Sequence, residues 1–394
     1  MINQSVLQNI RIRILDFTWV LAGPYATRIL ADFGAEVIKV QPHTPEAEDT
    51  FSRGYYNTWN RNKLGITLNL NKPQGVAIAK RLVGISDAVV ENFTPRVMAN
   101  WGLNYESLKQ IKPDIIMLSM STMGNTGPWR DYVGFGPTVQ AFSGITYLTS
   151  FPDKPPLGLG YSYADHVAGL MAALALLGAL EYRQRTGEGQ YIDVSQAEAM
   201  ASLLGEAIVD YTRNGSLPEP VGNNSTQAAP HGVYRCQGDD RWCAIAAFTD
   251  EEWEGFKRAL GSPAWAEDSR FTSLAGRLEN VDELNRLVKG WTRQHSAEEV
   301  MAWLQEQGVA AGVVQDASDL ANDPQLKQRG FFVELDHPEL GKTISDATPI
   351  RLSDTPAKFN RAAPTPGQDN DYVYKQLLGM SGDEVIQFRE QGVI

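Results

Sequence analysis

The chain has 394 residues, which is long enough for a large buried core and more than one domain. Its content of 43% hydrophobic and 21% charged residues is ordinary for a globular protein. The net charge of −12 argues against a nucleic-acid partner, because binding phosphates normally requires a basic face. The two cysteines, Cys236 and Cys243, fit neither a zinc site nor a secreted disulfide framework, so we expect both to be buried and no metal to be bound. The first residues carry no signal-sequence pattern, and we expect a cytoplasmic protein without a membrane partner.

The first third of the chain alternates strand and helix patterns, which predicts a parallel sheet covered by helices. Short apolar runs predict strands at 12–17, 37–40, 66–70, 88–91 and 114–119. Pro24 and Pro73 suit the first turns of two helices between these strands, and a short helix is expected at 105–111. These elements indicate a Rossmann-like domain. The Gly-x-Gly-x-x-Gly fingerprint is missing, so we do not expect NAD.

The run 167–180 is almost purely apolar and rich in Ala and Leu, which predicts a core helix too short to span a bilayer. Asp165 lies at the start of this run. The positive end of the helix dipole should favour the ionised form of its carboxylate. An anion at the edge of an apolar layer could act as a nucleophile, and a structural helix cap is the alternative for this residue. A Gly turn then leads to a further strand, and a helix is expected at 196–209.

The composition changes after a polar stretch rich in Gly, Asn and Pro, which is typical of a linker. A hairpin is expected from 231–236 and 242–247, followed by helices at 250–260, 281–294 and 297–307. Beyond Phe331 we expect irregular and extended structure up to a short final helix. The sequence therefore predicts an α/β protein with a large Rossmann-like domain over 1–212, a linker over 213–230, a small α+β domain over 231–325 and a return segment over 326–394.

Several segments together resemble the class III CoA-transferases, also called the CaiB/BaiF family, which includes formyl-CoA and carnitine CoA-transferases. They match in chain order over the whole length, at 11–24, 30–40, 60–63, 67–70, 90–93, 139–144, 185–190 and 323–326. The resemblance implies that Asp165 is the nucleophile, forming an aspartyl anhydride and then an aspartyl–CoA thioester. It implies a return segment that rejoins the first domain and an interlocked dimer, formed with an identical or a homologous chain. Coenzyme A would be a substrate, with no permanently bound cofactor, and the other substrate would be a carboxylic acid.

Because CoA carries phosphates, an acidic chain must gather local cations near strand ends to bind it. The candidate CoA contacts are Val20, Ala22, Arg61, Lys63, Asn92, Phe93 and Arg96, and Asn92 and Phe93 also match the family motif. The cations would hold the CoA phosphates, Phe93 would pack on the adenine, and Asn92 would bond to the pantetheine or a phosphate. A solvated surface charge is the alternative for each cation. The chain has Leu21 where the formyl-CoA enzyme has glutamine, and it lacks that enzyme's Gly-rich run, which suggests a larger acyl group. Gln41 and Asn100 also depart from the family pattern, so the adenosine end could be held differently.

Two other functions remain open at this stage. An α-methylacyl-CoA racemase would share the fold, but segment 134–144 contains no His or Asp to move a proton. A non-catalytic subunit of a heteromeric CoA-transferase is the second alternative. Among the transferases, the sequences of segments 91–98 and 134–137 most resemble those of enzymes for dicarboxylic or aryl acids, such as the succinyl-CoA:benzylsuccinate type. Succinyl-CoA is therefore a candidate donor.

For several other side chains the sequence allows both a functional and a structural role. His166 and His231 are interpreted as structural or substrate-shaping. Segment 221–225 is either a lid, completed across a dimer, or a static turn. Four aromatic side chains either line an acyl pocket or belong to the core: Trp19, Tyr25, Trp59 and Tyr163.

Overall fold

The computed structural model describes residues 12–42 and 54–394, so Arg11 and the first ten residues lie outside the described part. The chain forms two compact units. The first combines the residues up to Thr146 with Gly158–Leu217 and Leu326–Ile394, and the second combines Tyr147–Leu157 with Pro218–Gln325. The assignment of Tyr147–Leu157 to the second unit has no counterpart in the expected boundaries. The backbone N–H of Gly222 donates to the carbonyl of Ser150 at 3.2 Å, which joins this short segment to residues of the expected linker.

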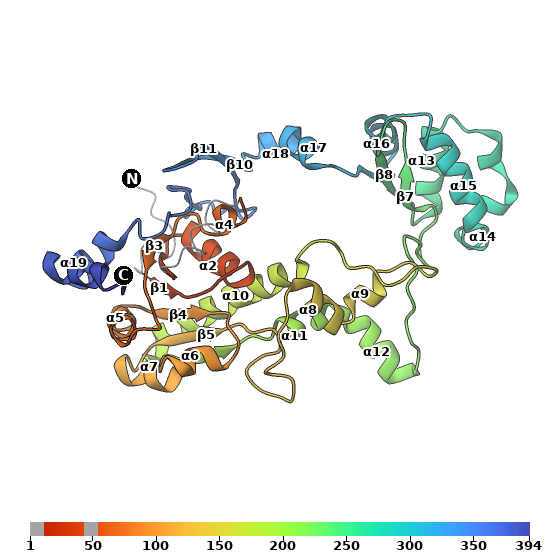
Figure 1. The fold of residues 1–394 in the computed structure, drawn as a ribbon. Coiled ribbons are helices and arrows are strands. Elements are labelled where there is room, and N and C mark those ends of the chain that lie inside the picture. Colours follow the sequence, from red (N-terminus) through yellow and green to blue (C-terminus); the bar gives the residue numbers. More distant parts are fainter. Residues whose placement is uncertain (1–11, 43–53) are drawn as a thin grey trace. The chain divides into compact units, whose positions relative to one another are not determined.

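A six-stranded sheet forms the centre of the first unit (Figure 1). Its strands are β1 (Arg13–Asp16), β2 (Glu36–Gln41), β3 (Leu64–Thr67), β4 (Ala88–Glu91), β5 (Ile116–Ser119) and β6 (Tyr191–Asp193). Every adjacent pair is parallel, in the order β3-β2-β1-β4-β5-β6. The expected α/β architecture is confirmed. The order reverses between β1 and β4, and such a switch point is where open parallel sheets bind ligands.

Helices cover both faces of this sheet, because alternate strand residues point to opposite sides. Ile14, Val37 and Val90 pack with α2 and α10 in one core, and Leu15, Ile38 and Val89 pack with α5 and α7 in the other. The helices up to the start of the second unit are α2 (Ala22–Asp32), α4 (Gly54–Trp59), α5 (Pro73–Gly84), α6 (Arg96–Asn100), α7 (Tyr105–Ile111), α8 (Gly136–Phe142), α9 (Ile145–Leu148), α10 (Tyr163–Thr186), α11 (Gln196–Ala201) and α12 (Gly205–Asn214). A 3₁₀ turn at Ser202–Leu204 separates α11 from α12, so the single helix expected at 196–209 is wrong.

Helix α10 is longer than the expected 167–180 and has 24 residues. It ends at Gly187, whose φ of 77° gives the left-handed C-cap that glycine adopts without strain. By length and apolar composition alone α10 could cross a membrane, but half of its most apolar window is buried inside the protein. Its buried side is rich in alanine, and glycine at position 169 lets α2 approach closely: a methyl group there would lie 2.8 Å from the Ala22 carbonyl oxygen. This packing is typical of a core helix.

The carboxyl-terminal part of the first unit is more regular than expected. Irregular and extended structure was expected there, and the chain forms the antiparallel hairpin β10 (Phe332–His337) and β11 (Gly341–Asp346), so the extended part is confirmed and the hairpin was not anticipated. Asp346, at the end of β11, pairs with Arg28 at 3.0 Å and with Arg61 at 3.1 Å, which fixes the hairpin to α2. The remaining elements are α18 (Pro324–Gln328), a π-helix (Tyr372–Leu377) and α19 (Gly382–Glu390).

The second unit is built on the antiparallel sheet β7 (His231–Arg235), β8 (Trp242–Ala246) and β9 (Ala310–Val313). The hairpin is formed as predicted, and β9 was not anticipated. Helices α13 (Asp250–Ala259), α14 (Leu274–Glu279), α15 (Val281–Thr292), α16 (Ala297–Glu306) and α17 (Ala317–Asn322), with 3₁₀ turns at Ala264–Glu267 and Ser269–Phe271, complete the unit. Capping boxes start α13 and α16, and Trp253, Phe256 and Phe271 fill the core. Cys236 and Cys243 are both free and buried.

Candidate active site

A cleft of about 180 Å³ opens at the switch point of the six-stranded sheet. It is lined by residues that follow the carboxyl ends of three strands: Trp19 and Val20 after β1, Asn92 and Phe93 after β4, and Thr122 after β5. Asp165 and Gln196 line the same cleft from the starts of α10 and α11. The fold therefore brings the expected nucleophile together with four of the positions considered on sequence grounds: Trp19, Val20, Asn92 and Phe93.

Asp165 occupies the first turn of α10, and only 8% of the residue is exposed. Its anionic form is stabilised by its own backbone N–H and by that of Ala22, the first residue of α2, which both act to lower its pKa. The backbone of α8 is also close, because a methyl group built on Gly136 would lie 2.6 Å from Oδ2 of Asp165. A side chain at position 136 would collide with the carboxylate. The nucleophile candidate thus lies where the starts of three helices meet.

Burial controls the ionisation of Asp165. Desolvation raises its pKa to about 6, against the opposing effect of the two backbone N–H donors. The backbone N–H groups at the helix start favour the anion, as expected for this end of a helix, but the cost of removing the charge from water is larger here. At neutral pH the group is still mostly a carboxylate, and it is more basic than an exposed aspartate.

Arg61 and Lys63 are both fully buried, whereas a CoA phosphate contact would require an exposed cation. The guanidinium of Arg61 is held by Asp32 at 2.6 Å, and by the side chain and backbone of Asp346. The ammonium of Lys63 contacts Asp16, Asn60 Oδ1 and the carbonyl of Pro24, each at 3.0 Å. The structure therefore corrects both expectations: these cations neutralise buried carboxylates and tie α2 to its surroundings.

The side chain of Asn92 lines the cleft and is hydrogen-bonded to the protein backbone. Its Oδ1 accepts from the backbone N–H of Trp19 at 2.9 Å, and its Nδ2 donates to the Trp19 carbonyl at 3.0 Å. The expected direct bond from Asn92 to CoA is not supported by this arrangement. Phe93 remains half-buried in the cleft wall, with its ring tilted against that of Trp19 at 6.4 Å.

The cations near this cleft lie at its rim. Arg130 is among the lining residues, and Arg96 is exposed beside the lining residues Pro95 and Val97. Both arginines contact the single carboxylate of Asp131, Arg96 at 2.7 Å and Arg130 at 3.6 Å, which leaves a net positive charge. The sequence analysis missed Arg130, Tyr132, Thr122 and Gln196. Arg130, Tyr132 and Thr122 could have been found from the sequence, because their segment directly follows the buried parallel strand β5.

His166 is enclosed by aromatic rings on the side of α10 next to Asp165. Its Nδ1 donates to the carbonyl of Ser162 at 2.8 Å, and its Nε2 contacts the hydroxyl of Tyr161 at 2.9 Å. The rings of Tyr25 and Trp59 approach to 5.0 and 5.2 Å. Burial lowers the pKa of His166, so the ring is neutral at pH 7. Both nitrogens of His166 are thus engaged within the protein, and its role, structural or substrate-shaping, stays a prediction.

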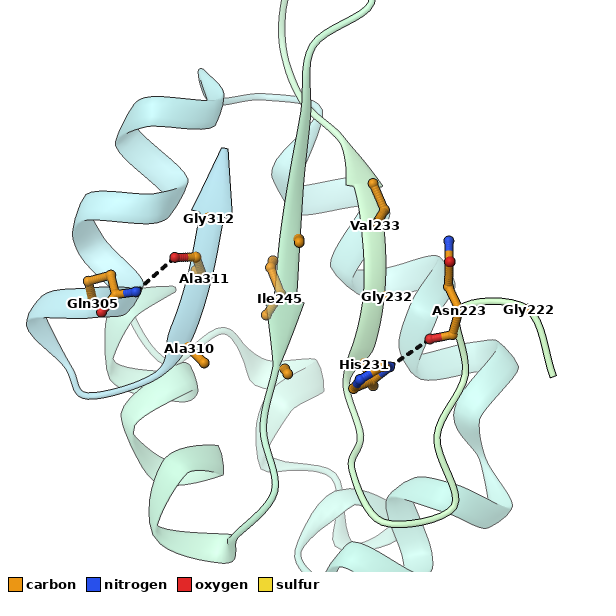
Figure 2. A pocket seen from close by; sticks show the side chains of 12 residues that line it. Gly222, Asn223, His231, Gly232, Val233, Ile245, Gln305, Ala310, Ala311 and Gly312 are labelled. Atoms are coloured by element: carbon orange, nitrogen blue, oxygen red, sulfur yellow. Dashed lines mark hydrogen bonds between the residues drawn. The ribbon is translucent and has the colours of Figure 1, made fainter. Parts of the chain in front are cut away.

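A second cavity, of about 460 Å³, lies in the second unit on the sheet β7-β8-β9 (Figure 2). Its walls are mostly small residues, including Gly232, Ala244 and Gly312. His231 Nδ1 donates to the carbonyl of Asn223 at 2.7 Å, which holds the segment considered as a lid against β7 (Figure 2). The described residues contain no group of three or more His, Cys, Asp or Glu side chains that could hold a metal ion.

Comparison with known proteins gives a consistent result over nearly the whole chain. The model of CoA-transferase family III matches residues 10–370. The succinyl-CoA–D-citramalate CoA-transferase of Chloroflexus aurantiacus is 36% identical over 393 residues, covering 97% of each chain. The alpha subunit of the succinyl-CoA–L-malate CoA-transferase of the same organism is 34% identical over 97% of this chain and 92% of that one. A crystal structure of a CaiB/BaiF family protein from Brucella suis superposes with a TM-score of 0.87 at 31% identity, covering 95% of this chain and 100% of that chain.

Proposed function

The chain belongs to CoA-transferase family III and is a class III CoA-transferase, and we propose that it moves CoA from succinyl-CoA to a carboxylic acid through covalent intermediates on Asp165. The observation that carries this proposal is the position of Asp165 in the cleft. The residue is buried, yet its pKa of about 6 leaves it ionised at neutral pH, and backbone N–H groups surround it. A carboxylate in that state is available as a nucleophile without a general base.

The reaction proceeds through four acyl transfers. The Asp165 carboxylate attacks the thioester carbonyl of succinyl-CoA, the C–S bond breaks, and a succinyl–aspartyl anhydride and CoA thiolate result. The thiolate attacks the aspartyl carbonyl of the anhydride, which releases succinate and forms an aspartyl–CoA thioester. The acceptor carboxylate attacks this thioester to give a new anhydride, and the thiolate then attacks the acceptor's carbonyl to release the new acyl-CoA. An anhydride retains the activation of a thioester, so ATP is not needed.

The surroundings of Asp165 fit this sequence of steps. Each attack creates an oxyanion, and preplaced backbone donors are usually the largest contribution to stabilising it. The N–H of Ala22 already points to the carboxylate, at the start of α2. The absence of a side chain at Gly136 leaves room for the tetrahedral carbon between α8 and α10.

Succinyl-CoA is proposed as the donor because two similar proteins are named for it, the D-citramalate and L-malate CoA-transferases. By the same comparison we propose a dicarboxylic acid as the acceptor. Incubating the purified enzyme with succinyl-CoA and a panel of mono- and dicarboxylic acids, with products identified by mass spectrometry, tests both points. Transfer from succinyl-CoA to none of the dicarboxylic acids, with transfer from another donor, would contradict the proposed substrates.

We further propose that the CoA phosphates bind at the Arg96–Asp131–Arg130 rim and that Phe93 packs on the adenine. Replacing Arg130 with glutamine should raise KM for the acyl-CoA about tenfold and change kcat little, because the lost contact is made equally in ground and transition states. Steady-state kinetics with Arg185→Gln as the control, an exposed arginine in the last turn of α10, measures this. An unchanged KM in Arg130→Gln would place the phosphates elsewhere.

The racemase alternative requires a side chain free to take an α-proton. Segment 134–144 contributes no titratable group, and both nitrogens of His166 are engaged by Ser162 and Tyr161. These features favour the transferase.

We propose a dimer, which the exposed side of α10 supports. Leu170, Leu174 and Leu177 recur at helical spacing and are exposed, Leu174 by 72%. The segment near Asn223 could then serve as a lid across the dimer. Light scattering of the purified chain should give twice the chain mass. A monomer that becomes active only with a homologous chain would instead indicate a heteromer, as the alpha-subunit name of one relative suggests.

A further inference from the structure

The turn between β1 and α2 contains a strained residue at the edge of the cleft. Val20 has a φ of 61°, in the left-handed region that a β-branched side chain rarely occupies. The residue is 41% exposed, so burial of its side chain does not explain the conformation. Strain of this kind persists only where neighbouring structure enforces it, and it is concentrated at functional sites.

Asn92, which directly follows the neighbouring strand β4, holds the turn in this conformation. Its amide forms hydrogen bonds to both the N–H and the carbonyl of Trp19, the residue immediately before Val20. Asn92 itself is fixed, because the adjacent Glu91 is buried and accepts from the N–H of Phe93 at 2.8 Å. These two hydrogen bonds, which we call the Asn92 clamp, therefore join the loop after β4 to the turn after β1.

The turn leads into the start of α2, whose first residue interacts with the proposed nucleophile. Two residues beyond Val20, the backbone N–H of Ala22 stabilises the anion of Asp165 and lowers its pKa. The position of this N–H depends on the path of the chain through Val20, since Leu21 makes no side-chain cap at the start of α2. Val20, Asn92 and Asp165 line one cleft.

We propose that Asn92 is a positioning residue: by clamping Trp19 it holds Val20 in the left-handed conformation, which aims the Ala22 N–H at Asp165. The side chain sets the basicity and placement of the nucleophile without touching CoA. This inference rests on the proposed role of Asp165, but its test can be read independently of activity.

Three other ionisable side chains, those of Tyr55, His166 and Arg130, lie near Asp165 in the sequence or in the cleft. Tyr55 of α4 interacts electrostatically with the carboxylate, and burial raises its pKa above the ordinary value, so it stays neutral in the relevant range. His166 follows Asp165 on α10, and burial lowers its pKa. Arg130 lines the same cleft from the loop after β5.

The test measures the pKa of Asp165 by ¹³C NMR of protein labelled at the aspartate carboxyl carbons. The Asp165 signal is assigned as the one missing from Asp165→Asn. In Asn92→Leu the clamp is lost, and we expect the pKa of Asp165 and the acid limb of kcat/KM to rise by about one pH unit, since a hydrogen bond to the anion is weakened. Thr94→Val, which changes the same loop without touching the clamp, should leave the pKa unchanged.

Glycine adopts a positive φ without cost, so adding Val20→Gly to Asn92→Leu should move the Asp165 pKa back toward the wild-type value. If Asn92→Leu does not fold, Asn92→Ala removes the same two hydrogen bonds. An unchanged Asp165 pKa in the folded Asn92 variant, or no recovery on adding Val20→Gly, would overturn the inference. If instead the proposed role of Asp165 as the nucleophile were wrong, Asp165→Asn would remain active, while Asn92→Leu would still change the pKa of Asp165 measured by NMR.

Discussion

Replacing Asp165 with asparagine should lower kcat by at least about a thousandfold, because the amide keeps the shape of the side chain and cannot form the anhydride. Losing covalent catalysis removes several kcal/mol of barrier lowering. The measurement is the rate of CoA exchange between succinyl-CoA and its acceptor. Turnover above about one hundredth of the wild-type rate would show that another residue carries the acyl group.

The same variant should be more stable than the wild type at pH 7, which separates lost chemistry from lost folding. The pKa of Asp165 is raised to about 6 in the folded protein, above the value near 4 of an unfolded chain. The protonated form therefore contributes stability that is present below about pH 4 and lost as pH rises through about 6. Asparagine does not ionise, so urea unfolding should show a gain of roughly 1–2 kcal/mol at pH 7 and little difference at pH 4.

Replacing Lys63 with methionine should destabilise the protein by about 3 kcal/mol, because it leaves the buried carboxylate of Asp16 with less compensation. Lys63 and Asp16 are both fully buried and lie 3.0 Å apart. Lys39, at 3.3 Å from Asp16, limits the loss. Urea unfolding measures the change, and Lys109→Met, which removes an exposed lysine on α7, is the control.

Kinetics on the folded Lys63→Met variant should show little change in KM for the acyl-CoA. The opposite pattern, with stability unchanged and KM raised, would mean that Lys63 binds a CoA phosphate after all and that its buried position is not the one used in the reaction.

The parts of the fold that local pattern determines could be predicted from the sequence. Strand 88–91 and helix 105–111 coincide with β4 and α7, because a short apolar run and a capped amphipathic turn are both local signals. The parallel sheet follows from the alternation of such elements. Strand β9 and the hairpin β10–β11 were missed because Gly, Lys and Asp residues interrupt their patterns, and only pairing with a partner strand makes them regular.

A site residue was predictable where its role depends on its position within one helix or strand. It was not predictable where its role depends on a partner far away in the sequence. Asp165 could be located from the start of an apolar helix. The burial of Arg61 could not, because its partner Asp346 lies 285 positions away in the sequence. The raised pKa of Asp165 could not be predicted for a similar reason: burial depends on the packing of segments that are distant in the sequence, whereas the helix dipole is visible in one segment alone.

The central claim is that Asp165 carries CoA during the reaction. The direct test is to mix the enzyme with succinyl-CoA without acceptor, quench in acid, digest, and measure the peptide containing Asp165 by mass spectrometry. The account predicts that this peptide gains the mass of one CoA less one water, that hydroxylamine converts the adduct to a hydroxamate at the same residue, and that Asp165→Asn shows neither. A CoA or acyl adduct on a different residue, formed at the rate of turnover, would contradict it.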